Sequence, residues 1–143
     1  MAAIAESHPE HIACAHASPW NDYGAEPPAG QIRITSAESV KFTMSLLASI
    51  AKRLPSKFFS TGGDEVNMDC YSIDSQTQAD LEASGRTLEQ ALDSFTREAH
   101  STLASLGKTP VVWEEMVLEH DIELRNDTVV MSVTLSAVIF FPC

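Results

Sequence analysis

Two long stretches of the sequence repeat apolar residues at the three- and four-residue spacing of an amphipathic helix. The first predicts a helix over residues 37–54, which Pro55 ends because proline cannot continue a helix. Thr35 and Glu38 stand three residues apart at its start, which is the spacing of a capping box. The apolar face of this helix consists of Val40, Leu47, Ile50 and Leu54.

The second stretch has the clearest helical pattern and predicts a helix over residues 88–106. Thr87 and Gln90 have capping-box spacing at its start, and Gly107 follows as a stop signal. Before it, a polar region predicts a short helix over residues 75–82, ended by Gly85. The apolar face of the long helix consists of Leu88, Leu92, Phe95, Ala99, Leu103 and Leu106.

Three short runs of aromatic and β-branched residues predict strands over residues 57–61, 110–113 and 127–131. Strands that alternate with long helices imply βαβ units and a parallel sheet, so the predicted fold class is α/β. Residues 18–30 contain three prolines and two glycines, and this composition predicts a long surface loop.

Acidic pairs follow two of the predicted strands. Asp64 and Glu65 come directly after a glycine pair, and Glu114 and Glu115 come directly after a tryptophan. Catalytic groups of parallel α/β folds collect at the carboxyl ends of strands. Adjacent carboxylates push their pKa values apart, so that one can hold a proton for general acid catalysis on a glycosidic oxygen. The alternative is that these acids only cap a helix or solvate a loop.

Charge narrows the possible partners. The 143 residues include 9 Lys and Arg against 20 Asp and Glu, a formal net charge of −11. Phosphate backbones and anionic lipids repel such an acidic chain, which argues against nucleic acid and membrane surfaces as partners. The longest apolar run, residues 129–141, is well short of the roughly 20 residues that a membrane-spanning helix needs.

The string around the first acidic pair, FSTGGDEVN, resembles the signature of family 20 glycoside hydrolases, the β-N-acetylhexosaminidases, and is most similar to fungal members. Three further blocks agree with that family in the expected order: HPEHIACAHASPW, QTQADLEASGRTLEQALDSF and GKTPVVWEEMV. The resemblance reaches to about Met131. It implies a glycosidase of carbohydrate metabolism and the middle βα units of a (β/α)8 TIM barrel, a fold that needs roughly 250 residues.

The resemblance also implies a substrate class and a compartment. The substrates are expected to be oligosaccharides that end in N-acetylglucosamine or N-acetylgalactosamine, such as chitobiose, with no cofactor and no metal. Family members of this kind are secreted or vacuolar/lysosomal, whereas the first residues of this chain have no signal-peptide pattern.

The resemblance assigns roles to three side chains. Glu65 matches the general acid and base, which protonates the leaving-group oxygen and later deprotonates the attacking water. Asp64 matches the residue that orients the substrate's 2-acetamido group, which is itself the nucleophile in this substrate-assisted scheme. Trp113 matches an aromatic wall of the acetamido pocket, although without the resemblance a core tryptophan is the better interpretation. Glu114 matches a position in the family's WEE block, with no role assigned.

Three cysteines cannot all pair within one chain. The resemblance implies a disulfide between Cys14 and Cys70, which leaves Cys143 free and requires an oxidising compartment. Asn126 begins a glycosylation sequon, which matters only in the secretory pathway.

The chain also departs from the family pattern. Residues 1–131 are interpreted as a fragment of the catalytic barrel, and residues 132–143 as an aberrant apolar tail that does not match the family. Barrel strands that supply further sugar contacts in the family have no counterpart here. We therefore expect the chain to be inactive alone, and the alternatives are a non-catalytic carbohydrate-binding remnant or a truncated gene product without function.

A metal site at the N-terminus is a further alternative, because His8, Glu10, His11, Cys14 and His16 cluster in the sequence. Pro9 breaks the helical spacing of these residues and no ligand pair follows downstream, so no metal site is predicted.

The remaining charged residues and histidines are interpreted as surface groups. His100 and His120 are expected on the surface of a helix and a loop. The acids Glu82, Glu89, Asp93 and Glu98 are expected to form a solvated helix face.

Overall fold

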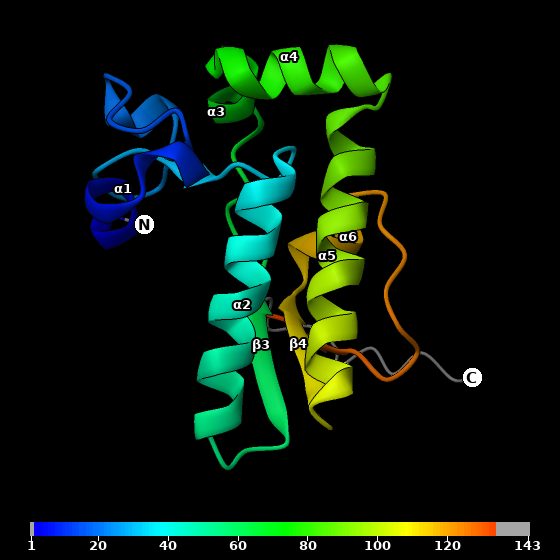
Figure 1. The fold of residues 1–143 in the computed structure, drawn as a ribbon. Coiled ribbons are helices and arrows are strands. Elements are labelled where there is room, and N and C mark those ends of the chain that lie inside the picture. The colour runs from blue at the N-terminus through cyan, green and yellow to red at the C-terminus, as the bar shows by residue number, and fades with distance from the viewer. Residues whose placement is uncertain (1, 134–143) are drawn as a thin grey trace.

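The computed structural model describes residues 2–133, which fold as helices packed against a small parallel sheet (Figure 1). Most of the expected tail, including Cys143, lies outside the described residues. The elements in chain order are α1 (Ala2–Ser7), the 3-10 helix η1 (Pro9–His11), β1 (Ile12–Ala13), the 3-10 helix η2 (Trp20–Asp22), β2 (Gln31–Ile32), α2 (Ala37–Arg53), β3 (Phe58–Gly62), α3 (Met68–Ile73), α4 (Ser75–Ser84), α5 (Leu88–Ser105), β4 (Thr109–Trp113), α6 (Glu115–Leu118) and β5 (Val129–Met131).

The predicted parallel sheet is confirmed, with the strand order β3-β4-β5. Phe58 of β3 lies opposite Thr109 of β4, and Trp113 at the end of β4 lies opposite Met131 of β5. Helices α2 and α5 run side by side over one face of this sheet (Figure 1). The chain from β3 through α5 to β4 is thus a βαβ unit, and the carboxyl ends of its strands lie at one edge of the sheet.

The starts of the two long helices differ in how well they were predicted. At α5 the predicted capping box is confirmed, because Thr87 Oγ1 accepts from the Gln90 amide at 3.2 Å and Gln90 Oε1 accepts from the Thr87 amide at 3.0 Å. At α2 the prediction is wrong, because Ser36 is the N-cap. The hydroxyl of Thr35 instead donates to Asp80 of α4, at 2.9 Å.

The expectation that His100 and His120 are surface residues is wrong. His100 on α5 is 1% exposed, and its Nε2 lies 3.4 Å from Thr61 Oγ1 on β3. Burial, followed by the positive charge of Arg125, lowers the pKa of His100. The His120 side chain is also buried, with its Nδ1 3.1 Å from Glu89 Oε1.

The prediction of a solvated acidic helix face is correct only in part. Glu82 and Glu98 are exposed, but Glu89 and Asp93 bind the loop that follows α6. Glu89 accepts from the Asp121 amide at 3.3 Å, and Asp93 accepts from the Glu123 amide at 2.8 Å. These two acids fasten the connection to β5 against α5.

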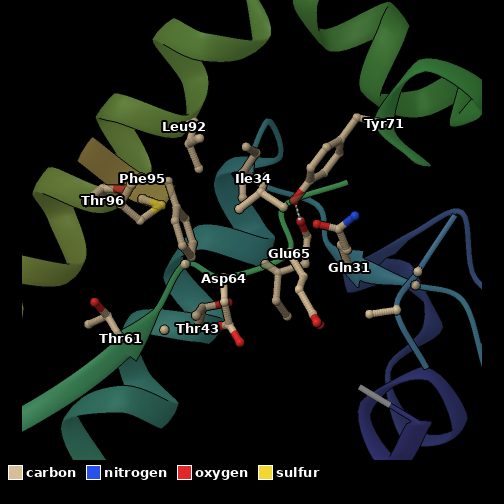
Figure 2. A pocket seen from close by; sticks show the side chains of 18 of the residues that line it. Gln31, Ile34, Thr43, Thr61, Asp64, Glu65, Tyr71, Leu92, Phe95 and Thr96 are labelled. Carbon is tan, nitrogen blue, oxygen red and sulfur yellow. Dashed lines mark hydrogen bonds between the residues drawn. The ribbon is translucent and has the colours of Figure 1, made fainter. Parts of the chain in front are cut away.

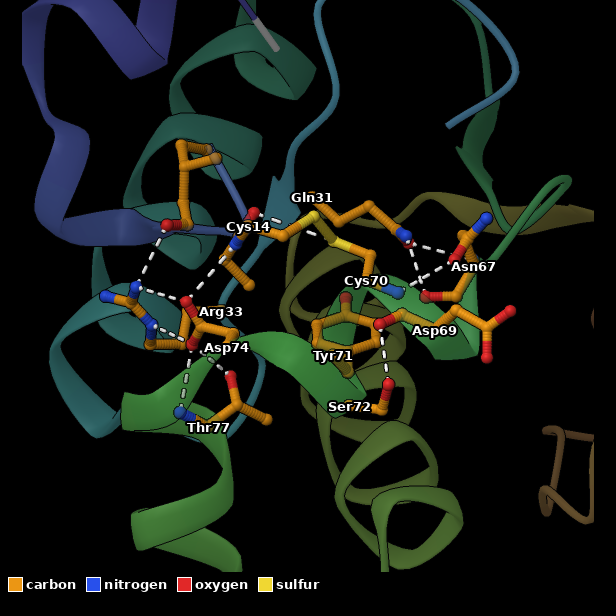
Figure 3. The surroundings of a disulfide bond; sticks show 12 residues. Cys14, Gln31, Arg33, Asn67, Asp69, Cys70, Tyr71, Ser72, Asp74 and Thr77 are labelled. Carbon is orange, nitrogen blue, oxygen red and sulfur yellow. Dashed lines mark hydrogen bonds and ion pairs between the residues drawn. A yellow bond between two sulfur atoms is a disulfide. The ribbon is translucent and has the colours of Figure 1, made fainter. Parts of the chain in front are cut away.

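A disulfide between Cys14 and Cys70 joins the N-terminal segment to α3 (Figure 3). The N-terminal segment contains a two-stranded antiparallel pair, β1 with β2, that the sequence analysis did not predict. The disulfide is part of an apolar cluster, whose buried members are Ala13, Cys14, Ile34, Cys70, Tyr71, Ala91, Leu92, Val112 and Met116. Within residues 2–133, no helix is both long and apolar enough to cross a membrane.

The carboxylate of Asp74 forms a second connection at the same place (Figure 3). Arg33 donates to both of its oxygens at 3.0 Å, Thr77 donates through its hydroxyl at 2.7 Å, and the Cys14 amide donates at 3.2 Å. Burial alone would raise the pKa of Asp74, but the hydrogen bonds from Arg33 and Thr77 outweigh it and lower the pKa from 3.8 to about 2.

We expect this carboxylate to make the fold sensitive to acid. Because the pKa of Asp74 is lower in the folded chain, its contribution to stability is fully present above about pH 4 and is lost as the pH falls towards about 2. Asp74→Asn should lower the free energy of unfolding by about 2 kcal/mol near neutral pH, and by much less near pH 2. Urea titrations at several pH values measure this, with exposed Asp69→Asn as the control. A loss that stays constant across this range would contradict the assignment.

Candidate active site

The chain leaves β3 through an irregular segment that depends on two glycines. The pairing of β3 with β4 shifts register between Ser60 and Gly62, which is a bulge of the kind that redirects side chains at sheet edges. Gly62 and Gly63 follow with φ values of 75° and 99°, in the left-handed region that side chains rarely adopt. The glycine pair therefore turns the backbone sharply where the strand ends.

Gly63 is required for a second reason, which is close packing against α6. A Cβ atom added at Gly63 would lie 2.2 Å from Met116 Cγ, and Met116 is itself buried. The loop after β3 therefore presses against the short helix that follows β4, so the GGDE and WEEM blocks of the sequence meet in space. Packing at this density leaves no room for a side chain.

Asp64 and Glu65 stand directly after this turn, and both are exposed. Glu65 has a φ of 57°, an uncommon value for a residue with a side chain. Such backbone strain often accompanies functional sites. Within residues 2–133, no hydrogen bond from another residue engages either carboxylate, so both oxygen pairs are available to a ligand.

Both acids line one pocket of about 580 Å³ at the carboxyl end of β3 (Figure 2). Figure 2 shows the two carboxylates pointing in the same direction below a group of apolar side chains. A concave, mostly apolar wall with a few polar groups is the usual form of a small-molecule site. The apolar wall includes Ile34, Tyr71, Leu92, Phe95 and Met116.

Two lining residues, Gln31 and Tyr71, position the acidic loop and were not predicted from the sequence. Gln31 makes two hydrogen bonds to the backbone of Asn67, donating through Nε2 at 3.0 Å and accepting through Oε1 at 3.2 Å. The Tyr71 hydroxyl donates to the Ile32 carbonyl at 2.9 Å, and burial raises the pKa of Tyr71. Together they hold β2 against the segment that follows the acids.

The second acidic pair and the tryptophan before it lie elsewhere. Trp113 is half-buried at the end of β4 and is not among the residues that line the pocket. Glu114 accepts hydrogen bonds from the Ser132 hydroxyl and the Val133 amide, and Glu115 begins α6. The structure therefore brings only the first acidic pair to the pocket.

The other predicted residues are found as follows. Asn126 is exposed in the loop before β5, so its side chain is accessible for attachment of a glycan. Cys14 is in the disulfide, so it is not available as a metal ligand. His8, Glu10 and His11 do approach one another, whereas His16 does not join them.

A parallel βα sheet with two carboxylates over a pocket at a strand's carboxyl end is the arrangement of βα-barrel enzymes. The sequence model of the glycosyl hydrolase family 20 catalytic domain matches residues 1–135, and the chain belongs to that family. A β-hexosaminidase of Arthroderma benhamiae is 37% identical over 127 residues, which cover 87% of this chain and 20% of the relative. β-Hexosaminidase 1 of Arabidopsis thaliana is 26% identical over 129 residues, covering 90% of this chain and 23% of the relative.

Solved structures agree with this assignment. An exo-β-N-acetylglucosaminidase of Vibrio harveyi, in complex with N-acetylglucosamine, superposes with a TM-score of 0.69 at 28% identity, over 91% of this chain and 20% of that one. A chitobiase of Flavobacterium johnsoniae has the same fold, with a TM-score of 0.67 at 19% identity, over 90% of this chain and 19% of that one. The described elements are thus part of a TIM barrel, and the chain spans about a fifth of the length of these relatives.

Proposed function

We propose that Asp64 and Glu65 are the catalytic pair of a β-N-acetylhexosaminidase, which removes terminal N-acetyl-hexosamine residues from oligosaccharides such as chitobiose. The observation that carries this proposal is the position of both carboxylates in one pocket, directly after the bulged end of β3. Membership of family 20 supports it, because the family uses substrate-assisted retaining catalysis. A net charge of −11 is compatible with a neutral sugar.

In the proposed reaction Glu65 first acts as an acid. Its proton passes to the glycosidic oxygen while the carbonyl oxygen of the 2-acetamido group attacks C1, so the bond from C1 to the leaving oxygen breaks. Glu65, now a carboxylate, then takes a proton from a water molecule that attacks C1 and opens the cyclic intermediate. The configuration at C1 is inverted twice and is therefore retained.

Asp64 is proposed to act on the acetamido group. Its carboxylate accepts a hydrogen bond from the acetamide N–H, which directs the carbonyl oxygen at C1. The same negative charge stabilises the positive charge of the cyclic intermediate, an effect that grows when the pocket excludes water. Because Asp64 and Glu65 are adjacent on one turn, both can reach the same sugar.

Trp113 is proposed to contact the acetamide methyl group. It ends β4, the strand next to β3, so it stands at the same edge of the sheet as the acidic pair. An indole ring gives a flat apolar surface suited to a methyl group. The half-buried position of Trp113 outside the pocket wall means that this contact requires the sugar to extend towards β4.

The disulfide supports a location for the protein. A buried disulfide between Cys14 and Cys70 persists only in an oxidising compartment, which is compatible with a secreted or vacuolar/lysosomal protein. In such a compartment the exposed Asn126 becomes a glycosylation acceptor.

The role of Asp64 is tested in a chimaera, in which residues 1–131 of this chain replace the matching segment of the Arthroderma benhamiae relative. The chimaera supplies a complete barrel, and the chain alone is assayed beside it with the expectation of far slower turnover. Asp64→Asn should lower kcat on a chromogenic N-acetylglucosaminide by about 10²–10³-fold. The matching glucoside lacks the acetamido group and therefore the nucleophile of this scheme, so neither the parent chimaera nor the variant should turn it over.

Exposed Asp69→Asn, five residues further along, is the matched control and should keep full activity on the N-acetylglucosaminide. Turnover of the glucoside by the parent chimaera would contradict the substrate-assisted scheme, and an Asp64→Asn variant with full activity on the N-acetylglucosaminide would contradict the role of Asp64. Sugar binding without turnover in the otherwise intact chimaera would favour a carbohydrate-binding role over an enzyme.

A further inference from the structure

A second group of titratable side chains lies near the N-terminus, outside the pocket of Asp64 and Glu65. His8 Nδ1 lies 3.3 Å from Glu10 Oε1, and His11 Nε2 lies 3.8 Å from the same oxygen. One nitrogen or oxygen atom from each of these three side chains lies within 4.8 Å of the others. We propose that His8, Glu10 and His11 bind a zinc ion.

The local backbone explains why the three side chains converge. Pro9–His11 forms the 3-10 helix η1, and the His11 amide donates to the His8 carbonyl at 3.1 Å. A 3-10 helix has three residues per turn, so residues three apart lie on the same side. The proline that prevents α-helical spacing therefore favours a tighter turn, which brings His8 and His11 together.

The spacing of the ligand atoms suits a tetrahedral ion. Zinc binds nitrogen and oxygen at about 2.0–2.1 Å, so a tetrahedral ion holds its ligand atoms about 3.3 Å apart. The separations of 3.3 and 3.8 Å from Glu10 Oε1 need only small side-chain adjustments to reach this value. Two imidazoles and one carboxylate are a ligand set that zinc accepts, with a fourth position open to water.

His11 has the outer contact expected of a metal-binding histidine. Its Nδ1 is hydrogen-bonded to Ser39 Oγ at 3.1 Å, and Ser39 is fully buried in the first turn of α2. The tautomer with the proton on Nδ1 donates to Ser39 and leaves the Nε2 lone pair facing Glu10. Metal-bound histidines are held in this way, by a hydrogen bond from the other ring nitrogen.

The two imidazole rings are also held by packing. Both lie against Phe42 of α2, with ring centroids 5.0 Å away for His8 and 4.4 Å away for His11. Their own centroids are 5.8 Å apart in a stacked arrangement. Little side-chain freedom remains to be lost when an ion binds, which favours affinity.

Zinc binding is measured by isothermal titration calorimetry on the full chain, with thiols alkylated so that Cys143 cannot act as a ligand. We expect one ion per chain. His8→Ala and Glu10→Gln should each weaken binding by at least about tenfold, since loss of even an outer-shell partner costs 10–100-fold. Both side chains are about half exposed, so these variants should have the same melting temperature as the parent in metal-free buffer.

His16→Asn is the matched control, because it removes a nearby exposed imidazole and asparagine tolerates the left-handed backbone at that position. It should bind zinc as the parent does, and zinc should raise the melting temperature of both. Absence of zinc uptake by the parent would overturn the proposal. Uptake that persists unchanged in His8→Ala and Glu10→Gln would also overturn it, because the ion would then lie elsewhere.

Discussion

Glu65→Gln is expected to lower kcat of the chimaera described above by about 10²–10⁴-fold on a chromogenic N-acetylglucosaminide, the range that general acid–base catalysis supplies. Glutamine has nearly the same shape as glutamate but can neither give a proton to the leaving oxygen nor take one from water. KM should change much less, because the substitution removes an interaction made mainly in the transition state.

The size of the loss should depend on the leaving group. A strongly acidic leaving group, such as dinitrophenolate, departs without a proton, so its release should be much less sensitive to Glu65→Gln than the release of a sugar. Comparing the loss in kcat/KM for dinitrophenyl and disaccharide substrates, which excludes the later water step that both share, therefore separates loss of the proton donor from general damage to the pocket. An equal loss of kcat/KM on both substrates would contradict the assignment of Glu65 as the acid.

The comparison of the parent with Glu65→Gln is not affected by a change in backbone conformation. The left-handed φ of 57° is retained by either side chain, because glutamate and glutamine have the same branching and length. Glu82→Gln, at an exposed position on α4, is the matched control and should leave kcat unchanged. An inactive Glu82→Gln chimaera would show that the loss comes from the fold rather than from the chemistry.

Local sequence patterns predicted the long helices well, because the spacing of apolar residues repeats over several helical turns in each of them. The α5 capping box depends only on Thr87 and Gln90, three residues apart, and is present as expected. At Thr35 the same local pattern fails, because the Thr35 hydroxyl donates its hydrogen bond to the carboxylate of Asp80, 45 residues away in sequence. A contact between residues so far apart in sequence cannot be predicted from a short window of sequence.

Short elements and buried histidines escaped prediction for a related reason. β1 and β2 have two residues each, too few to show any period, and depend on contacts such as the disulfide at Cys14. His100 is polar and stands beside the apolar stripe of α5, so it was placed on the surface. It is buried because α5 packs on the sheet, mainly on β4, and the Thr61 hydroxyl of the neighbouring β3 provides a partner.

The candidate site was predictable as a motif but not as a pocket. Asp64 and Glu65 are adjacent in sequence, and the glycine pair before them already indicates an unusual backbone. The wall opposite them comes from other elements, including Tyr71 on α3 and Gln31 on β2. Their roles depend on hydrogen bonds to distant backbone groups, which only the folded chain brings together.

Removal of the disulfide is expected to have the largest effect on stability. In the chain-entropy account, a bond that joins residues 56 apart in sequence stabilises the fold by about 4 kcal/mol, because it restricts the unfolded chain. The double variant Cys14→Ala/Cys70→Ala should lose about that free energy of unfolding. Alanine is preferred to serine, because both positions are buried and a serine hydroxyl would be left without a partner.

Urea unfolding of the double variant and the parent, both under oxidising conditions, measures this loss. A domain of this size is stable by only about 5–15 kcal/mol, so a 4 kcal/mol loss should shift the urea midpoint strongly. Cys143→Ala is the matched control and should unfold as the parent does. A reductant should destabilise the parent and leave the double variant unchanged, and if the reductant destabilised both equally the effect would not come from this bond.

Because Asp74 ties the Cys14 amide to α4 beside the disulfide, the loss should be smaller in an Asp74→Asn background, where the two connections no longer support each other.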